Sequence, residues 1–327
     1  MTVAQQYDAL ILDLDGTVWN GGTPIPNAVE SLNKAPCKRM YVTNNASRAP
    51  QAVADILSSM GLSVGAEDVL TSAQAAVEIV RGVVEPGAAV LVLGTDSFRD
   101  LASEAGFRVV DSADDNPQAV LHGHSTDNGW AQLSEAALAI GRGAKYFASN
   151  LDSTLPSERG MTVGNGSMVA AVTHATGVEP EAAGKPGPAM FHSAARRMGS
   201  QVPLAVGDRL NTDIAGGVAA GMDTLQVMTG VSGYYDTLYA TPDQQATLIA
   251  EDMTGLFHEA QELLPGPQGG FTAWVENGSV VLDGGQPGAT PIQALRTAIG
   301  AVRASGASVS GVQFASPAAQ EAISQWT

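Results

Sequence analysis

Short apolar runs alternate with amphipathic segments along most of the chain. Buried strands are predicted at residues 9–14, 39–43, 88–93, 107–110, 119–121, 145–148, 203–206 and 224–227. Helices are predicted at residues 27–34, 50–60, 130–140, 167–176, 188–198, 213–220 and 256–264. This alternation is typical of a parallel sheet covered by helices on both faces. It therefore predicts an α/β fold with a Rossmann-like parallel-sheet core.

A segment rich in proline and glycine, residues 265–270, separates this region from a different pattern. Two apolar runs follow and flank Asn277-Gly278, the strongest short signal for a β-hairpin. A helix at 291–305 and a strand at 308–314 complete a small α+β extension. Roughly 60 residues are few for an independent domain. The extension is therefore expected to pack on the rest of the chain and to bury Phe271, Trp274 and Phe314.

Composition narrows the function classes. The 327 residues include 33 acidic and 16 basic side chains, which give a net charge of −17. Such a surface repels nucleic acid and anionic membranes, so neither is an expected partner. One cysteine, Cys37, allows no internal disulfide and fits a cytoplasmic protein. No apolar run approaches the ~18 residues of a membrane span, and the first residues do not resemble a signal peptide.

The first candidate chemistry lies at the end of the first predicted strand, in Asp13-Leu14-Asp15-Gly16-Thr17. Open α/β sheets build their sites at the carboxyl ends of parallel strands. Asp13 and Asp15 have strand spacing i, i+2, which places two carboxylates on the same side. A divalent cation would relieve their repulsion, and Gly16 permits a sharp turn out of the sheet. An ordinary Asp-Gly turn after a strand is the competing interpretation.

A second acidic motif, Gly207-Asp208 with Asp213 five residues later, follows the strand at 203–206. Helix capping would explain Asp213, because it starts the predicted helix at 213–220. Capping does not explain Asp208, which comes directly after a buried strand and a glycine. Asp208 is therefore the stronger candidate for a site residue.

Two further motifs carry groups that suit a phosphate. Thr43 and Asn44 follow a strand and can donate hydrogen bonds to phosphate oxygens, although both are also ordinary turn residues. Lys185, between Gly184 and Pro186, is a cation on a stiff loop. A solvated loop lysine is the alternative reading of that motif on its own.

Together, in this order, the four motifs resemble those of the haloacid dehalogenase superfamily of phosphohydrolases. The resemblance extends from Tyr7 to about Leu264, and the arrangement is similar to the phosphoglycolate, para-nitrophenylphosphate and glycerol 3-phosphate phosphatase branch. The extra C-terminal piece is similar to that of bacterial glycerol 3-phosphate phosphatases. The resemblance implies a core domain at residues 1–87 and 184–265, an inserted α/β cap domain at 88–183, and an extension at 271–327.

The resemblance also implies catalytic roles. Asp13 would be the nucleophile that forms an aspartyl-phosphate, and Asp15 the general acid and base. Thr43 and Lys185 would hold the phosphoryl group. Mg²⁺ would be bound by Asp13, by the backbone carbonyl of Asp15, and by Asp208. Asp213 would support the metal's waters or Lys185 without binding the ion itself.

Candidate substrate contacts come mainly from the cap. Where this branch often has Gly-x-Asp after a cap strand, this chain has Gly123-His124-Ser125. His122 and His124 could also ligate a metal, but no third ligand is evident. The full set of proposed substrate contacts is Asn44, His124, Asn150, Asp152, Arg159 and Asn165.

The expected substrate is a small phosphate ester. Acidic residues outnumber basic ones in 88–183, which favours glycerol 3-phosphate over 2-phosphoglycolate, whose carboxylate is a second anionic group. Phosphoglycolate and sugar or nucleotide monophosphates are alternatives, as are a phosphoaspartate receiver and an inactive interaction module. A nucleotide-hydrolysing P-loop is disfavoured because its motif is missing.

The sequence leaves open whether the chain forms a homo-oligomer. No catalytic motif lies beyond Gly269, so removal of the extension after Pro267 is expected to spare the chemistry.

Overall fold

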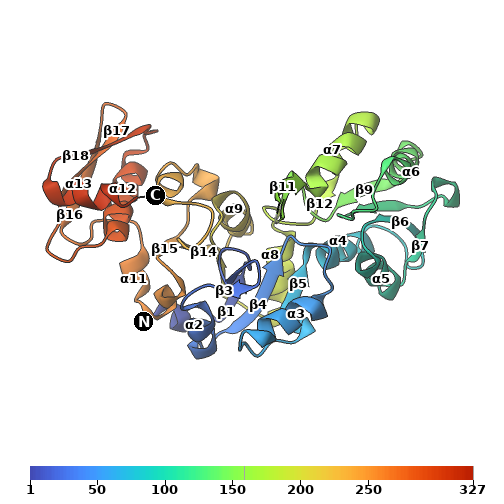
Figure 1. Ribbon diagram of the computed structural model, residues 1–327, viewed down its shortest axis with the longest axis horizontal. Coiled ribbons are helices and arrows are strands. Elements are labelled where there is room, and N and C mark those ends of the chain that lie inside the picture. The colour runs from blue at the N-terminus through green and yellow to red at the C-terminus, as the bar shows by residue number, and fades with distance from the viewer. Residues whose placement is uncertain (158, 327) are drawn as a thin grey trace. The chain divides into compact units, whose positions relative to one another are not determined.

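The computed structural model describes residues 1–157 and 159–326 and divides into two compact units (Figure 1). The first unit comprises Met1–Arg39, Met60–Leu62 and Ala195–Thr327, and the second comprises Met40–Ser59 and Ser63–Ala194. Each unit contains a parallel sheet with helices, which confirms the predicted α/β class. Among the described residues, no helix is both long enough and apolar enough to cross a membrane.

Four buried parallel strands form the sheet of the first unit, in the order β15-β14-β13-β1. Their bounds are β1 (Ala9–Leu12), β13 (Pro203–Gly207), β14 (Asp223–Val227) and β15 (Leu248–Ala250). The register pairs Leu12 with Val206. Asp13 and Asp208, which follow these strands, therefore leave the sheet at the same edge.

Short helices surround this sheet. They are α1 (Val3–Gln6), α2 (Ala28–Lys34), the π-helical turn η3 (Leu210–Ile214), α9 (Ala215–Ala219), α10 (Tyr234–Leu238), η4 (Pro242–Gln244), η5 (Met253–Phe257) and α11 (Ala260–Leu263). A two-stranded hairpin, β2 (Trp19–Asn20) and β3 (Thr23–Pro24), follows β1.

Two helix predictions in this unit were wrong in detail. The helix expected at 213–220 begins three residues earlier as η3, because the N–H groups of Asp213 and Ile214 both bond to the carbonyl of Arg209. Asp213 therefore lies inside a turn and does not start a helix. The helix expected at 256–264 is divided into η5 and α11, since His258 and Glu259 are extended.

The second unit contains a five-stranded parallel sheet in the order β12-β9-β8-β6-β7. Its strands are β6 (Ala89–Leu93), β7 (Arg108–Val110), β8 (Ala119–His122), β9 (Lys145–Ala148) and β12 (Glu181–Ala182). Helices α6 (Trp130–Gly141) and α7 (Asn165–Thr176) lie on one face, and α4 (Ser72–Arg81) and α5 (Asp96–Glu104) on the other (Figure 1). Leu91, Leu93 and Val120 pack beneath α6 and α7.

The remaining elements of the second unit precede and follow this sheet. They are β4 (Lys38–Thr43, whose first two residues belong to the first unit), α3 (Pro50–Ser59), η1 (Ala66–Asp68), β5 (Val69–Thr71), η2 (Ala113–Asp115), the hairpin β10 (Thr154–Ser157) and β11 (Gly160–Val163), and α8 (Ala189–Met198, whose last four residues belong to the first unit). Strands β4 and β5 pair in parallel. The sequence pattern did not predict α4, α5 or the β10–β11 hairpin.

The C-terminal extension belongs to the first unit and has no separate core. Its sheet has the order β16-β17-β18, formed by β16 (Phe271–Glu276), β17 (Ser279–Gly284) and β18 (Gly311–Phe314), and is joined by α12 (Pro291–Ser305) and α13 (Pro317–Ser324). Positive φ angles of 49° at Asn277 and 76° at Gly278 confirm the predicted hairpin turn. One hydrophobic cluster contains both extension side chains and Leu210, Ile214 and Ile249.

The prediction that three aromatic residues of the extension are buried was only partly right. Phe271 is 2% exposed, but Trp274 is 42% and Phe314 is 50% exposed. Trp274 alternates with the inward-facing Phe271 and Ala273 along β16, so it lies on the outer face of the hairpin. Phe314 is the last residue of an edge strand.

Candidate active site

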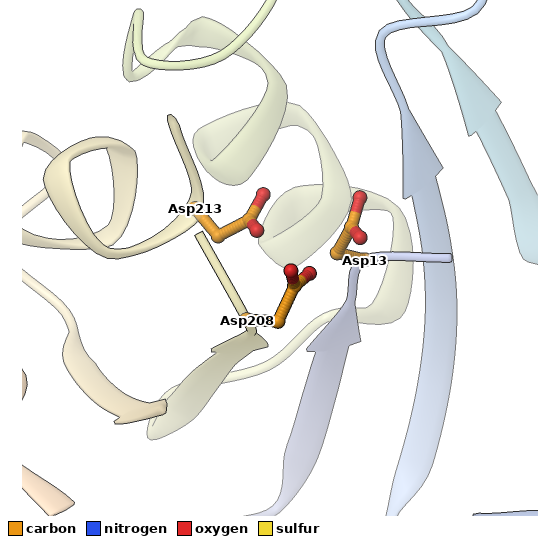
Figure 2. A group of neighbouring side chains, drawn as sticks. All are labelled: Asp13, Asp208 and Asp213. Carbon is orange, nitrogen blue, oxygen red and sulfur yellow. The ribbon is translucent and has the colours of Figure 1, made fainter. Parts of the chain in front are cut away.

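Three carboxylates gather where β1 and β13 end. Ligand oxygens of Asp13, Asp208 and Asp213 lie within 4.8 Å of one another. Figure 2 shows the three groups turned toward a common space. Asp13 follows β1, Asp208 follows β13, and Asp213 comes from η3. Asp213 therefore lies next to Asp13 and Asp208, the two side chains predicted from the sequence as metal ligands.

Asp208 is fully buried and held from several sides. Its carboxylate accepts a hydrogen bond from the Thr17 hydroxyl at 3.2 Å and one from the Val231 backbone N–H at 2.6 Å. Gly16 has a φ of +94°, and a Cβ atom there would lie 2.5 Å from the carboxylate carbon of Asp208. Only glycine lets the backbone at position 16 come this close to the Asp208 carboxylate, so Gly16 is required by the site as well as by the turn.

Asp213 is 3% exposed and folds back against the end of β13. Its Oδ2 accepts a hydrogen bond from the Arg209 N–H at 3.1 Å. A Cβ atom at Gly207 would lie 2.3 Å from the Asp213 Cβ, so the close approach also requires glycine there. The π-helical turn η3 is what aims this side chain toward Asp13 and Asp208.

Asp15 does not join the carboxylate cluster. Its side chain is exposed, and its Oδ1 accepts a hydrogen bond from the Trp19 indole N–H at 2.8 Å. This bond fixes the orientation of the carboxylate next to Asp13 while leaving it accessible. Such a placement suits a group that exchanges protons more than one that binds a metal through its side chain.

The donor set of the cluster fits magnesium. Three carboxylates this close repel one another strongly unless a cation is present. Hard carboxylate oxygens are the ligands that Mg²⁺ prefers. In the described part of the chain this is the one group of three or more acidic, histidine or cysteine side chains close enough to hold a metal ion. His122 and His124 therefore form no second metal group among those residues.

In the second unit, the Asn44 side chain forms two hydrogen bonds with the backbone of Lys185. The Asn44 carboxamide accepts a hydrogen bond from the Lys185 N–H at 2.8 Å and donates one to the Lys185 carbonyl at 3.0 Å. A Cβ atom at Gly184 would lie 2.7 Å from Asn44 Oδ1, so glycine makes room for this contact. The predicted Thr-Asn and Gly-Lys motifs are thus joined by direct hydrogen bonds.

Thr43 and Lys185 are both nearly buried, at 6% and 5% exposure. The Thr43 hydroxyl accepts a hydrogen bond from the Asn45 N–H at 3.1 Å, which leaves its own hydrogen available to donate. The Lys185 ammonium donates to the Val42 carbonyl at 3.4 Å. The second unit therefore places a hydroxyl and an ammonium group around the end of β4.

Amide side chains connect this region to the predicted cap loops. Asn150 donates to the carbonyl of Asn44 at 2.8 Å, and Asn165 donates to the carbonyl of Asn150 at 2.8 Å. The Asn150 Oδ1 accepts from the N–H of Asp152 at 3.2 Å. Asn150 and Asn165 therefore hold the loops through backbone groups, and Asn44 also donates to the Asp152 carboxylate at 3.3 Å.

The other cap candidates are dispersed. His122 is fully buried, its Nδ1 lies 2.8 Å from the Tyr146 hydroxyl, and burial lowers its pKa to about 4. It is therefore neutral near pH 7. His124 is partly exposed, and Arg159 is exposed on the turn between β10 and β11.

Sequence reasoning missed the segment that follows β14. Thr229 donates from its hydroxyl to the carbonyl of Gly16 at 2.6 Å, and Val231 binds Asp208 as described above. A Cβ atom at Gly230 would lie 2.0 Å from the Asp208 carboxylate. This segment follows the carboxyl end of β14, the strand next to β13, and that position could have identified it as part of the site.

Two family models match the parts of the chain that contain the four motifs. Residues 10–108 match the model for haloacid dehalogenase-like hydrolases, and residues 182–256 match an HAD-hydrolase-like model. The first region contains Asp13 and Thr43, and the second contains Lys185 and Asp208.

Individual relatives extend the likeness over the whole chain. The chain is 44% identical to the D-glycerol 3-phosphate phosphatase of Mycobacterium tuberculosis, over 86% of this chain and 80% of that protein. A crystal structure of glycerol phosphate phosphatase from that organism in complex with magnesium has a TM-score of 0.95 and 40% identity, and covers 100% of this chain and 99% of its own. A p-nitrophenyl phosphatase from Archaeoglobus fulgidus has a TM-score of 0.71 and 27% identity, and covers 76% and 98%.

Proposed function

The chain belongs to the haloacid dehalogenase-like hydrolases, and on that premise we propose that it hydrolyses glycerol 3-phosphate to glycerol and phosphate with the help of Mg²⁺. The observation that carries the proposal is the cluster of Asp13, Asp208 and Asp213 at one edge of a parallel sheet. The full-length likeness to a glycerol phosphate phosphatase supports the choice of substrate.

Asp13 is the proposed nucleophile. Its carboxylate attacks phosphorus, the bond to the ester oxygen breaks, and an aspartyl-phosphate forms on Asp13. Asp15, oriented by Trp19, gives a proton to the leaving alkoxide and later takes one from the water that hydrolyses the intermediate. The two acids need different environments for these roles, and only Asp13 lies in the carboxylate cluster.

Asp13, Asp208 and the backbone carbonyl of Asp15 are the proposed metal ligands, and Asp213 supports them from within the same cluster. Bound Mg²⁺ would neutralise negative charge on the phosphoryl oxygens. Thr43 and Lys185 are proposed to bind the same phosphoryl group through a hydroxyl and an ammonium donor.

We keep residues 88–183 as the proposed cap and 1–87 with 184–265 as the proposed core. Within the cap, the loops that contain Asn150 and Asn165 are held internally by those amides. We therefore propose that His124, Asp152 and Arg159 are the substrate contacts of this set, and that Asn44, Asn150 and Asn165 position the loops.

A cytoplasmic location is proposed from the single, buried Cys37.

Phosphate release from a panel of phosphate monoesters tests the proposed function. With Mg²⁺ present, glycerol 3-phosphate is expected to give a higher kcat/KM than 2-phosphoglycolate, because acidic residues outnumber basic ones in the cap. Excess chelator is expected to abolish turnover, and added Mg²⁺ to restore it.

A preference of tenfold or more for phosphoglycolate, about 1.4 kcal/mol of transition-state binding, would contradict the assigned substrate. Full activity in chelator would contradict the metal site instead. The two outcomes are separate, so the panel distinguishes a wrong substrate from a wrong mechanism.

Replacing Asn44 by alanine is expected to lower kcat by about 10- to 100-fold, because small displacements of a positioned group are costly. The variant loses both hydrogen bonds to the Lys185 backbone. Steady-state kinetics and inhibition by inorganic phosphate measure the effect, and phosphate is expected to bind more weakly.

Ser193→Ala is the matched control, since it removes a buried hydrogen bond to Glu78 in the same unit and does not contact Lys185. It is expected to lower Tm while keeping kcat. If a folded Asn44→Ala protein turns over like the wild type, Asn44 does not position Lys185.

A further inference from the structure

The segment Thr229–Gly233, called here the 229–233 loop, holds two parts of the carboxylate site. Val231 donates its N–H to Asp208, and Thr229 donates its hydroxyl to the carbonyl of Gly16. Ser232, 8% exposed, accepts a hydrogen bond from the N–H of Leu210 at 3.1 Å. The loop thus fixes the carboxylate of Asp208, the turn after Asp15 and the start of η3.

The 229–233 loop continues directly into α10, a helix of only five residues. A helix this short is not stable by itself and depends on tertiary contacts. Thr237 ties it to the loop by donating to the Gly233 carbonyl at 2.8 Å. Leu238 packs in the hydrophobic cluster shared with the extension. The conformation of the loop therefore depends on what α10 packs against.

Trp326 of the extension supplies one such contact. Its indole stacks on the ring of Tyr234, with centroids 6.0 Å apart and planes 16° from parallel, and meets Tyr235 edge-on at 5.7 Å. Trp326 is 5% exposed, and its indole N–H donates to the Pro291 carbonyl at the start of α12 at 3.2 Å. The indole is thus fixed to the extension on one side and to α10 on the other.

We infer that Trp326 is a positioning residue for the metal site, and that it sets the affinity for Mg²⁺ through α10 and the 229–233 loop. The inference rests on the proposed function, because it takes Asp208 as a metal ligand. Without the indole, α10 loses its aromatic partner in the extension and the Val231 N–H is held less firmly against Asp208. Partners that orient metal ligands typically change metal affinity 10- to 100-fold, and an indirect one belongs at the lower end.

Isothermal titration of the full-length protein with MgCl₂ tests this without relying on catalysis. Trp326→Ala is expected to bind Mg²⁺ about tenfold more weakly than the wild type. Trp326→Phe keeps a stacked ring and is expected to recover most of the affinity. Trp274→Ala is the matched control: it removes an exposed tryptophan of the same extension and is expected to bind as the wild type does.

All titrations are made well below the Tm of each variant, so that a purely structural role would lower Tm and leave the affinity unchanged. If Trp326→Ala does not fold, Tyr235→Ala replaces it, because Tyr235 is 39% exposed and meets Trp326 edge-on while stacking on Tyr239 within the same segment. That variant is expected to bind about threefold more weakly.

Equal Mg²⁺ affinity in the wild type and in the folded Trp326 or Tyr235 variant overturns this inference and leaves the proposed function intact. A wild-type protein that binds no Mg²⁺ overturns the proposed function, and the inference with it. Weaker binding by the Trp326 variant and unchanged binding by Trp274→Ala supports the inference.

Discussion

Asp13→Asn is expected to lower kcat by about 10⁴-fold or more, which corresponds to at least ~5.5 kcal/mol of transition-state stabilisation. An amide cannot attack phosphorus as the carboxylate does, so the covalent route is lost. Phosphate release with glycerol 3-phosphate and Mg²⁺ measures the effect. Intact-protein mass spectrometry after rapid quenching should detect a phosphorylated species for the wild type and none for the variant.

The same variant should not unfold the protein. Asp13 adds a third negative charge to a group that already contains Asp208 and Asp213. Removing one of three like charges relieves repulsion, so Tm in chelator is expected to stay constant or rise. A large loss of activity with no loss of Tm would therefore separate chemistry from stability.

Asp252→Asn provides the matched control. Asp252 lies in the same unit but binds the Thr254 N–H and the Asn27 amide, outside the carboxylate cluster. The variant is expected to keep wild-type kcat. If Asp13→Asn retains a tenth of wild-type turnover, Asp13 is not the nucleophile.

The sequence was most informative where a short motif follows a buried strand. Asp13 and Asp208 could be singled out because each stands directly after an apolar run, and parallel strands end at a common edge. The turn at Gly16 and the hairpin at Asn277-Gly278 could be predicted for a similar reason, since both positions need φ angles that favour glycine or asparagine. In these places local sequence and tertiary structure agree.

The role of Asp213 could not be read from its position. Its place before an apolar helical pattern is typical of a helix start, and the wider π-helical turn that aims it at Asp13 has no sequence signal. Asn44 and Asn45 present the same difficulty. They look alike in sequence, but Asn44 reaches a lysine 141 residues away while Asn45 accepts local bonds from Ser47. Only the tertiary fold distinguishes such neighbours.

Composition predicts a linker at residues 265–270. This segment is hydrogen-bonded to α12: the Gly266 N–H donates to the carbonyl of Arg296 and the Gln268 N–H donates to the Thr297 hydroxyl. A Cβ atom at Gly300 would lie 2.7 Å from the Cα of Gly266, so the segment packs tightly against α12. Glycine here permits close packing, and the structure changes what removal of the extension is expected to do.

Truncation after Pro267 is now expected to prevent stable folding. The extension covers Leu210, Ile214, Leu238 and Ile249 of the remaining chain. Exposing four such side chains costs ~1.5–3 kcal/mol each, or about 6–12 kcal/mol together. This is comparable to the ~5–15 kcal/mol that stabilises a typical protein. The buried Arg296, which binds the carbonyls of Ile249 and Glu262, would also be lost.

Soluble yield and thermal unfolding of the 1–267 fragment measure this effect against the full-length chain. The double variant Trp274→Ala, Phe314→Ala is the control, because it strips two exposed aromatic side chains from the same extension and should leave Tm and kcat nearly unchanged. Leu210 and Ile214 belong to η3, the turn that carries Asp213, so damage to the shared core should reach the carboxylate cluster. A soluble fragment with the Tm and turnover of the whole protein would show that the extension is a separate, dispensable domain.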